Sequence, residues 1–146
     1  MLFRSNLYGM AGIRLGICFA SKEIVAVLNR IKPPYNVNEL TQQRAKERLL
    51  KPEAVENEIA QIILERGLLE THLKTVSYID EIYPSDANFI LVKVDDANKR
   101  YQQLLEKNIV VRNRSSQVLC ENTLRLTVGS PEENAKLVAA LKELQP

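Results

Sequence analysis

The sequence predicts an α/β protein in which helices lie on one face of a small sheet. The chain has 146 residues, 45% hydrophobic and 26% charged, a composition typical of a soluble globular domain with a real core. From residue 52 onward the patterns follow the order helix, two strands, helix, two strands, helix, which favours a layer of helices on a sheet. Residues 1–50 do not fit that unit, so we expect two parts, residues 1–50 and residues 51–146.

The pattern of the first part predicts one strand and two helices. Residues 15–20 form a short apolar run after glycines, which is typical of a buried strand. Since the natural sheet neighbours of this strand are not in the chain, we expect it to offer an unpaired edge. Ser21 can cap a helix over residues 22–31, which the two prolines at 33 and 34 end. A second helix is expected from about residue 39 to residue 50.

The second part begins with a long amphipathic helix over residues 52–76. Pro52 suits the first turn of a helix, and apolar residues then recur mostly at three- and four-residue steps. Asp95 and Asp96 are placed to start a later helix, where negative charge and an Asp cap are favourable. The further elements are expected as strands at 78–83, 89–94, 109–112 and 123–128, and as helices at 97–107 and 131–144.

Charge and cysteine usage exclude several classes of function. The net charge is +2, with basic residues scattered among acidic ones, so a nucleic-acid partner is not expected. Cys18 and Cys120 lie far apart and His72 is the sole histidine, so we expect no metal site and no Cys-His nucleophile. We interpret both thiols as reduced core residues of a cytoplasmic protein, and His72 as solvated. No segment is long enough to span a membrane.

Four segments then carry a resemblance to a known family. The run from Tyr8 to Gly16, YGMAGIRLG, resembles the segment after the cofactor-binding lysine of class I and II aminotransferases, S-K-A-[FW]-G-x-A-G-x-R-x-G. KPPYNVN at 32–38, SDANF at 85–89 and LRLTVG at 124–129 follow in the order of the histidinol-phosphate aminotransferase branch. The resemblance covers residues 8–146 and implies the C-terminal part of a fold-type-I enzyme that uses pyridoxal phosphate. Residues 1–50 are then a remnant of its large domain, and residues 51–146 are its small domain.

The cofactor residues implied by the resemblance are incomplete. In the family a lysine forms a Schiff base with pyridoxal phosphate, and an arginine eight residues later binds the cofactor phosphate. Arg14 matches that arginine, so the lysine position holds Asn6, after Ser5. An amide nitrogen is not a nucleophile, so we expect no catalytic residue, with Ser5 and Arg14 as the cofactor-binding positions. The chain is expected to be inactive alone and not to bind the cofactor alone, whether it is a truncated reading frame or a decayed enzyme copy.

The resemblance also implies substrate-binding residues. Arg125 corresponds to the arginine that holds the substrate carboxylate or its counterpart, because a planar guanidinium donates two parallel hydrogen bonds to that group. Arg112 corresponds to the residue that reaches the phosphate of histidinol phosphate. Tyr35 and Asn36 lie in a linker that the family places near the active site and the dimer contact.

Three functions are therefore open. The first is the C-terminal part of an enzyme that transaminates histidinol phosphate with 2-oxoglutarate in histidine biosynthesis, acting on an amino acid or a phosphorylated amino alcohol. The second is a fragment of another class I or II amino-acid aminotransferase. The third is a non-catalytic α/β module that acts by association. Residues 1–50 should expose apolar surface, which promotes association, so we expect a homodimer.

Overall fold

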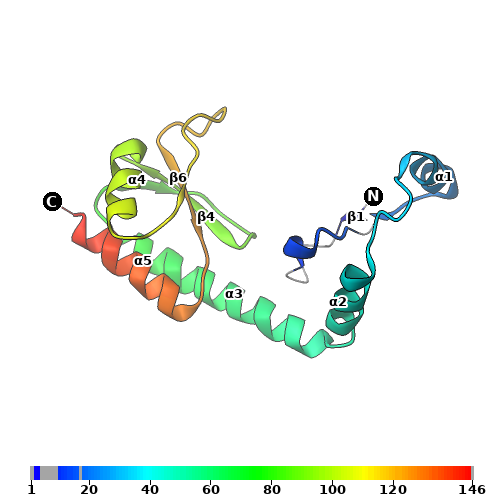
Figure 1. The fold of residues 1–146 in the computed structure, drawn as a ribbon. Coiled ribbons are helices and arrows are strands. Elements are labelled where there is room, and N and C mark those ends of the chain that lie inside the picture. The colour runs from blue at the N-terminus through cyan, green and yellow to red at the C-terminus, as the bar shows by residue number, and fades with distance from the viewer. Residues whose placement is uncertain (1, 4–9, 17, 146) are drawn as a thin grey trace. The chain divides into compact units, whose positions relative to one another are not determined.

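The computed structural model describes residues 2–3, 10–16 and 18–145, which divide into two compact units, residues 1–58 and residues 59–146. The division falls inside the long helix α3, Pro52–Leu73 (Figure 1). The domain boundary expected after residue 50 falls at the turn before α3, and it stays a prediction. Among the described residues, no helix combines the length and the apolar character that crossing a membrane requires.

The first unit contains a small strand pair and two helices. Strand β1, Leu2–Phe3, pairs antiparallel with β2, Cys18–Phe19, and a short 3-10 helix, η2, spans Ala11–Ile13. The strand expected at residues 15–20 is thus reduced to two residues and has a partner, so the expectation of an unpaired edge is wrong on the β1 side. The expectation of burial is also wrong, because Phe19 is 68% exposed. An isolated two-stranded ribbon offers little surface against which a side chain can be buried.

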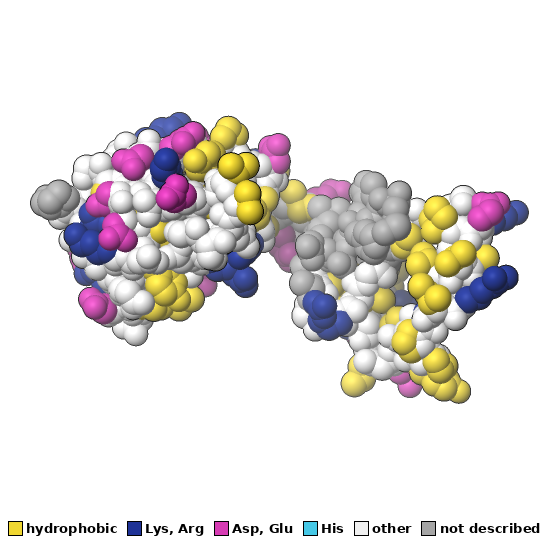
Figure 2. All heavy atoms as spheres, turned by 90° about the horizontal axis from the view of Figure 1, so that it is seen from above, with side chains coloured by type: hydrophobic (Ala, Val, Ile, Leu, Met, Phe, Trp, Pro, Cys, Tyr) yellow, Lys and Arg dark blue, Asp and Glu magenta, His cyan; other side chains and the backbone are white. Residues whose placement is uncertain are grey.

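Helices α1, Lys22–Ile31, and α2, Glu39–Leu49, confirm the helix predictions. Ser21 is the N-cap residue of α1, and Lys32 is extended, as expected for the residue before a proline. All residues of α1 are described, and none of them is buried. Its apolar side chains are all exposed, and Figure 2 shows such side chains gathered over this part of the surface. They are Ile24, Val25, Val27, Leu28 and Ile31.

The second unit is built on a four-stranded antiparallel sheet in the order β3-β4-β6-β5. Its strands are β3, Ile79–Ile82; β4, Phe89–Val94; β5, Arg112–Asn113; and β6, Thr123–Thr127. Its helices are the second half of α3, with α4, Ala97–Glu106, and α5, Pro131–Glu143. Residues of all three helices share one hydrophobic cluster with the sheet. This arrangement confirms the predicted α/β class with helices on a small sheet.

Alternation along the strands explains why only one face of the sheet is buried. In β4, Ile90, Val92 and Val94 are each 1% exposed, whereas the intervening residues are half-buried. A strand turns successive side chains to opposite faces, so the buried set faces the helices. Leu69 and Leu73 of α3 belong to the same cluster, which confirms that the long helix packs on the sheet.

One strand and two cysteines differ from the sequence-based expectation. Of the strand expected at residues 109–112, only Arg112 is in a strand, because α4 ends in a turn in which the N–H of Ile109 donates back to Leu104 O at 2.9 Å and Asn108 has a φ of 59°. Strand pairing begins only at Arg112. Cys18 and Cys120 are half-buried and outside the core cluster, so their assignment to the core is wrong.

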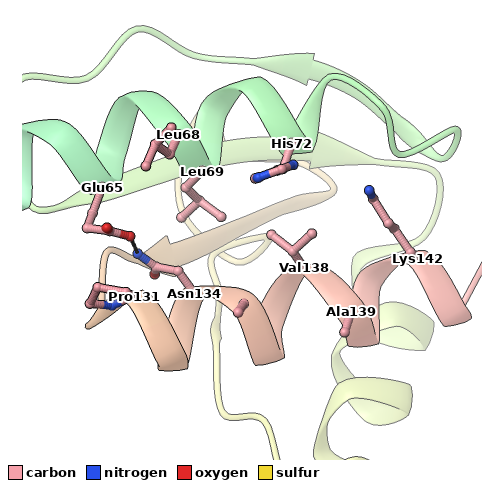
Figure 3. A pocket seen from close by; sticks show the side chains of 10 residues that line it. Glu65, Leu68, Leu69, His72, Pro131, Asn134, Val138, Ala139 and Lys142 are labelled. Atoms are coloured by element: carbon pink, nitrogen blue, oxygen red, sulfur yellow. Dashed lines mark hydrogen bonds between the residues drawn. The ribbon is translucent and has the colours of Figure 1, made fainter.

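A buried polar contact fastens α5 to α3. Asn134 donates from Nδ2 to Glu65 Oε2 at 2.8 Å and accepts from the N–H of Gly129 at 2.9 Å. Both Asn134 and Glu65 are 6% exposed. Figure 3 shows the two side chains pointing toward one another across the space between the helices. Because buried polar groups are costly when they lose their partners, this contact constrains how α5 lies on α3.

Asn134→Leu is expected to lower the free energy of unfolding by about 2–4 kcal/mol, because it leaves both Glu65 and the Gly129 N–H with one partner fewer. Chemical denaturation of the purified chain measures this loss. Lys136→Gln, an exposed substitution on the same helix, should change stability by less than about 0.5 kcal/mol. Equal stabilities for Asn134→Leu and the unchanged chain would contradict a stabilising role of the Asn134–Glu65 contact.

Candidate functional site: an arginine cluster on the open face of the sheet

Arg125 is placed by its strand on the face of the sheet that the helices leave free. Its neighbours in β6, Leu124 and Leu126, are 1% and 0% exposed and belong to the core. Alternation therefore turns Arg125 to the opposite face. On one side Arg125 is paired in register with Leu91 of β4, and on the other with Arg112 of β5. The two arginines expected to bind substrate are thus direct cross-strand neighbours.

An aromatic ring orients the Arg125 guanidinium. The Cζ atom of Arg125 lies 4.0 Å from the centre of the Phe89 ring, which belongs to β4. A guanidinium over an aromatic face is attracted by the electron density of the ring. Stacking of this kind restricts the plane of the guanidinium while its edge stays available for hydrogen bonds.

Two positive charges lie close enough to Arg125 to affect its pKa. Burial lowers the pKa of Arg125, and the nearby positive charges of Arg112 and Arg114 lower it further. Among the described residues, no carboxylate forms an ion pair with Arg125. Its Nε is buried and has no hydrogen-bond partner. A partly desolvated cation cluster without a counter-charge is a site that favours an anion.

Arg100 shows what a structural arginine in the same unit looks like. Its Nε and one terminal nitrogen donate to the two carboxylate oxygens of Asp95 at 2.9 and 2.6 Å, and its other terminal nitrogen donates to Leu144 O at 2.9 Å. Its Cζ lies 3.8 Å from the centre of the Tyr78 ring. The Asp95 partner raises the pKa of Arg100, the reverse of the shift at Arg125. Arg125 has the stacked ring but no ion pair with an acid among the described residues, and its Nε has no hydrogen-bond partner.

The cluster can bind and orient an anion, but it supplies no nucleophile or general base. Arginine remains protonated in proteins and offers donors in a fixed fork that matches a carboxylate or a phosphate. In the described part of the chain, no group of three or more His, Cys, Asp or Glu residues is arranged to hold a metal ion. The site is therefore suited to substrate recognition.

The other residues predicted from the sequence lie in the first unit or outside the described residues. Arg14 is exposed and has a φ of 55° in the turn after η2. Tyr35 is 99% exposed with a φ of 58°, and Asn36 is exposed as well. Ser5 and Asn6 lie outside the described residues. Among the predicted site residues, the structure thus brings Arg112 and Arg125 together, and the roles of the remaining ones stay predictions.

Sequence reasoning assigned no role to Arg114 or Phe89. The spacing of Arg112 and Arg114 could have indicated that their side chains lie together, because residues two apart in a strand share a face. That signal was hidden by the strand expected at 109–112, which ended before Arg114. Phe89 belongs to one of the segments that carry the family resemblance, but its contact with Arg125 depends on strand register, which the sequence does not specify.

A hollow with a volume of about 480 Å³ lies between α3 and α5, away from the arginine cluster. Figure 3 shows Glu65 and Asn134 at one end and His72 and Lys142 at the other, above a floor that includes Leu69 and Val138. The carboxylate of Glu65 already accepts hydrogen bonds from Asn134 and from Gln61. Since its buried polar group is satisfied, this groove is a weaker candidate site than the arginine cluster.

Arg112→Thr is expected to raise the free energy of unfolding by about 0.2–1 kcal/mol, because like charges directly opposite one another in a sheet are destabilising. Inorganic phosphate should stabilise the unchanged chain more than this variant, since a bound anion relieves the same repulsion. Denaturation with and without phosphate measures both effects. Lys99→Gln, which removes an exposed positive charge elsewhere in the unit, is the control. A loss of stability in Arg112→Thr speaks against repulsion at this site.

The comparisons with known proteins agree with the expected relationship. The histidinol-phosphate aminotransferase of Flavobacterium johnsoniae is 61% identical over 140 residues, which are 96% of this chain and 40% of that protein. The crystal structure of the histidinol-phosphate aminotransferase from Clostridium acetobutylicum matches with a TM-score of 0.89 at 26% identity, covering 97% of this chain and 44% of that one. The crystal structure of L-threonine-O-3-phosphate decarboxylase from Porphyromonas gingivalis matches with a TM-score of 0.77 at 27% identity, covering 95% and 44%.

The extent of these matches agrees with the expected correspondence to the C-terminal part of such proteins. The chain spans about 40% of the length of the curated relatives that it matches. The family model described as aminotransferase class I and II matches residues 5–141, which is nearly the whole sequence. This chain therefore belongs to the class I and II aminotransferase family.

Proposed function

We propose that this chain supplies the substrate-anion subsite of a histidinol-phosphate aminotransferase and does not complete a transamination by itself. The observation that carries the proposal is the guanidinium of Arg125, which has a buried Nε without a partner and lies beside Arg112. Two of the relatives, a histidinol-phosphate aminotransferase and an L-threonine-O-3-phosphate decarboxylase, are named for phosphorylated compounds. Both the site and these names point to an anionic substrate.

The two arginines have different roles in this proposal. Arg125 is half-buried and stacked on Phe89, so it can fix the orientation of a planar carboxylate through two parallel hydrogen bonds. Arg112 is exposed at the edge strand, so it can follow the position of a more distant phosphate group. In histidinol phosphate, which has no carboxylate, Arg125 holds the counterpart of that group. Fixing one end of the substrate positions its amino group for reaction.

The cofactor of the family is pyridoxal phosphate, which supplies an aldehyde that accepts the amino group and an electron-withdrawing ring. The residues present here do not make a site for its covalent attachment. Position 6 is an asparagine, and its amide nitrogen is not a nucleophile. Arg14, the expected phosphate ligand, is exposed, and a single exposed cation gives little affinity. We therefore assign no chemical step to the chain alone.

Histidinol phosphate is expected to bind the purified chain, and Arg125→Gln should weaken this binding at least about tenfold, because truncating a charge-assisted contact typically costs 2 kcal/mol or more. Isothermal titration calorimetry at low ionic strength measures both affinities. Lys99→Gln is the matched control, since it removes one positive charge away from the cluster. Equal affinities for the unchanged chain and Arg125→Gln would overturn the proposed subsite.

Pyridoxal phosphate is expected to form no specific covalent adduct with this chain, because the lysine position is Asn6. The measurement is the visible absorption spectrum of the mixture before and after borohydride, followed by mass analysis of the peptides. Modification spread over surface lysines fits the proposal. A stoichiometric adduct at one lysine, with a defined visible band, contradicts it and shows that another residue has replaced the attachment site.

We also propose that the chain forms a homodimer through the apolar face of α1. The support is that five apolar side chains of this helix are exposed, and contiguous exposed apolar surface promotes association. Light scattering at micromolar concentration should give the mass of a dimer for the unchanged chain and of a monomer for the double variant Ile24→Glu with Ile31→Glu. Arg30→Glu, a polar change on the same helix, is the control. A monomeric unchanged chain contradicts the proposal.

A further inference from the structure

We propose that Arg114 makes the arginine cluster select a doubly charged phosphate monoester over a singly charged anion. The inference rests on the proposed function, because it assigns a specificity-determining residue to the same subsite. The mechanism is electrostatic: Arg125 and Arg112 attract any anion, and Arg114 adds a third positive charge whose attraction is twice as large for a dianion as for a monoanion.

Strand pairing places Arg114 on the face that carries the cluster. The N–H of Arg114 donates to Thr123 O at 2.9 Å, so the pairing of β5 with β6 continues one residue beyond the end of β5. Since Arg112 and Arg114 are two residues apart in this paired segment, their side chains share a face. Arg112 is in register with Arg125, so that face is the one to which Arg125 points.

The backbone of Arg114 is fixed on both sides. Its carbonyl oxygen accepts from the N–H of Gln117 at 2.8 Å, and the next N–H, of Ser115, donates to Asn113 Oδ1 at 2.9 Å. The Arg114 side chain is half-buried, whereas that of Arg112 is exposed. The charge of a partly buried side chain on a hydrogen-bonded backbone is less screened by water and salt than the charge of a fully solvated side chain. Arg114 therefore adds a positive charge near Arg125, where the charge of Arg112 acts more strongly.

An unsatisfied polar atom in this strand pair supports a ligand in this region. Within the described residues, two buried side-chain polar atoms have no hydrogen-bond partner, the Nε of Arg125 and the Oγ of Ser115. Arg125 lies in β6, whereas Ser115 lies in the turn that follows the paired segment, so the Nε of Arg125 is the atom that belongs to the cluster. Buried polar groups without partners are uncommon, and both atoms can donate to an oxygen. The nearby positive charges of Arg112 and Arg114 also lower the pKa of Arg125, as expected for closely spaced cations.

The test compares methyl phosphate, a dianion at pH 8, with dimethyl phosphate, a monoanion of similar shape, by isothermal titration calorimetry of the full chain at low ionic strength. The unchanged chain should bind methyl phosphate more tightly by at least about fivefold, the scale of a charge difference at a partly solvated site. Arg114→Gln should reduce this ratio to about twofold or less, and it should lower the affinity for dimethyl phosphate by a smaller factor than the affinity for methyl phosphate, because the monoanion loses half as much attraction. Arg114→Lys, which retains the charge, should preserve most of the ratio, and Lys99→Gln should leave it unchanged.

The outcomes separate this inference from the function on which it rests. An unchanged ratio in Arg114→Gln, with binding of both probes intact, overturns the role of Arg114 and leaves the subsite in place. A parallel loss of both probes also overturns it, because Arg114 then contributes general affinity and not selectivity. If the unchanged chain binds neither probe, the proposed subsite itself fails, and the inference fails with it. If Arg114→Gln does not fold, the Arg114→Lys variant decides. Loss of its preference for methyl phosphate, with the charge retained and the protein folded, overturns the proposal that the charge of Arg114 sets the selectivity.

Discussion

The central position of β6 in the sheet determines both the stability of the second unit and its candidate site. The strand is paired with β4 along its whole length and with β5 at Leu124 and Arg125, so its register is defined on both sides at the arginine. Leu124 and Leu126 enter the core that α3, α4 and α5 cover, and Arg125 between them must then face away. A slip of one residue would bury the arginine and expose both leucines. The register that builds the core is therefore also the register that exposes the site.

The cluster on the open face stands in contrast to the rest of the unit. Arg100 is stacked, hydrogen-bonded and neutralised by Asp95, and the Asn134 contact satisfies the buried Glu65 carboxylate. At Arg112, Arg114 and Arg125, like charges are adjacent, and a buried donor lacks a partner. The polar groups of Arg100 and Glu65 thus have partners, whereas the Nε of Arg125 has none. Unfavourable local arrangements of this kind are concentrated at functional sites. A bound anion resolves this one.

Much of the fold could be predicted because its signals are local. Caps and prolines located the helices: Asp96 accepts from the N–H of Lys99, and α1 ends before Pro33, as expected. Short strands were harder, because their length depends on partners distant in the sequence. The apolar run at residues 109–112 has the pattern of a strand, but the backbone of Ile109 is held by the end of α4, and pairing starts only at Arg112. The same tertiary effect hid Arg114.

The candidate site could be predicted only in part. Resemblance to the family identified Arg112 and Arg125 as a pair, but the contact of Arg125 with Phe89 and the position of Arg112 beside Arg125 follow from strand register. Arg14, Tyr35 and Asn36 belong to the first unit, where α1 exposes an apolar face, and all three are exposed, so their roles stay predictions. Local patterns cannot specify such contacts.

The central claim is that the arginine cluster is an anion site, and arginine side-chain NMR tests it most directly. In a ¹H–¹⁵N spectrum of the Nε–H groups, titration with inorganic phosphate should shift the Arg125 signal along a saturable curve. The Arg100 signal should stay in place, because its donors are already bonded to Asp95 and Leu144. An Arg125 signal that does not move, or that moves linearly together with all other arginine signals, would show that the cluster has no defined anion site.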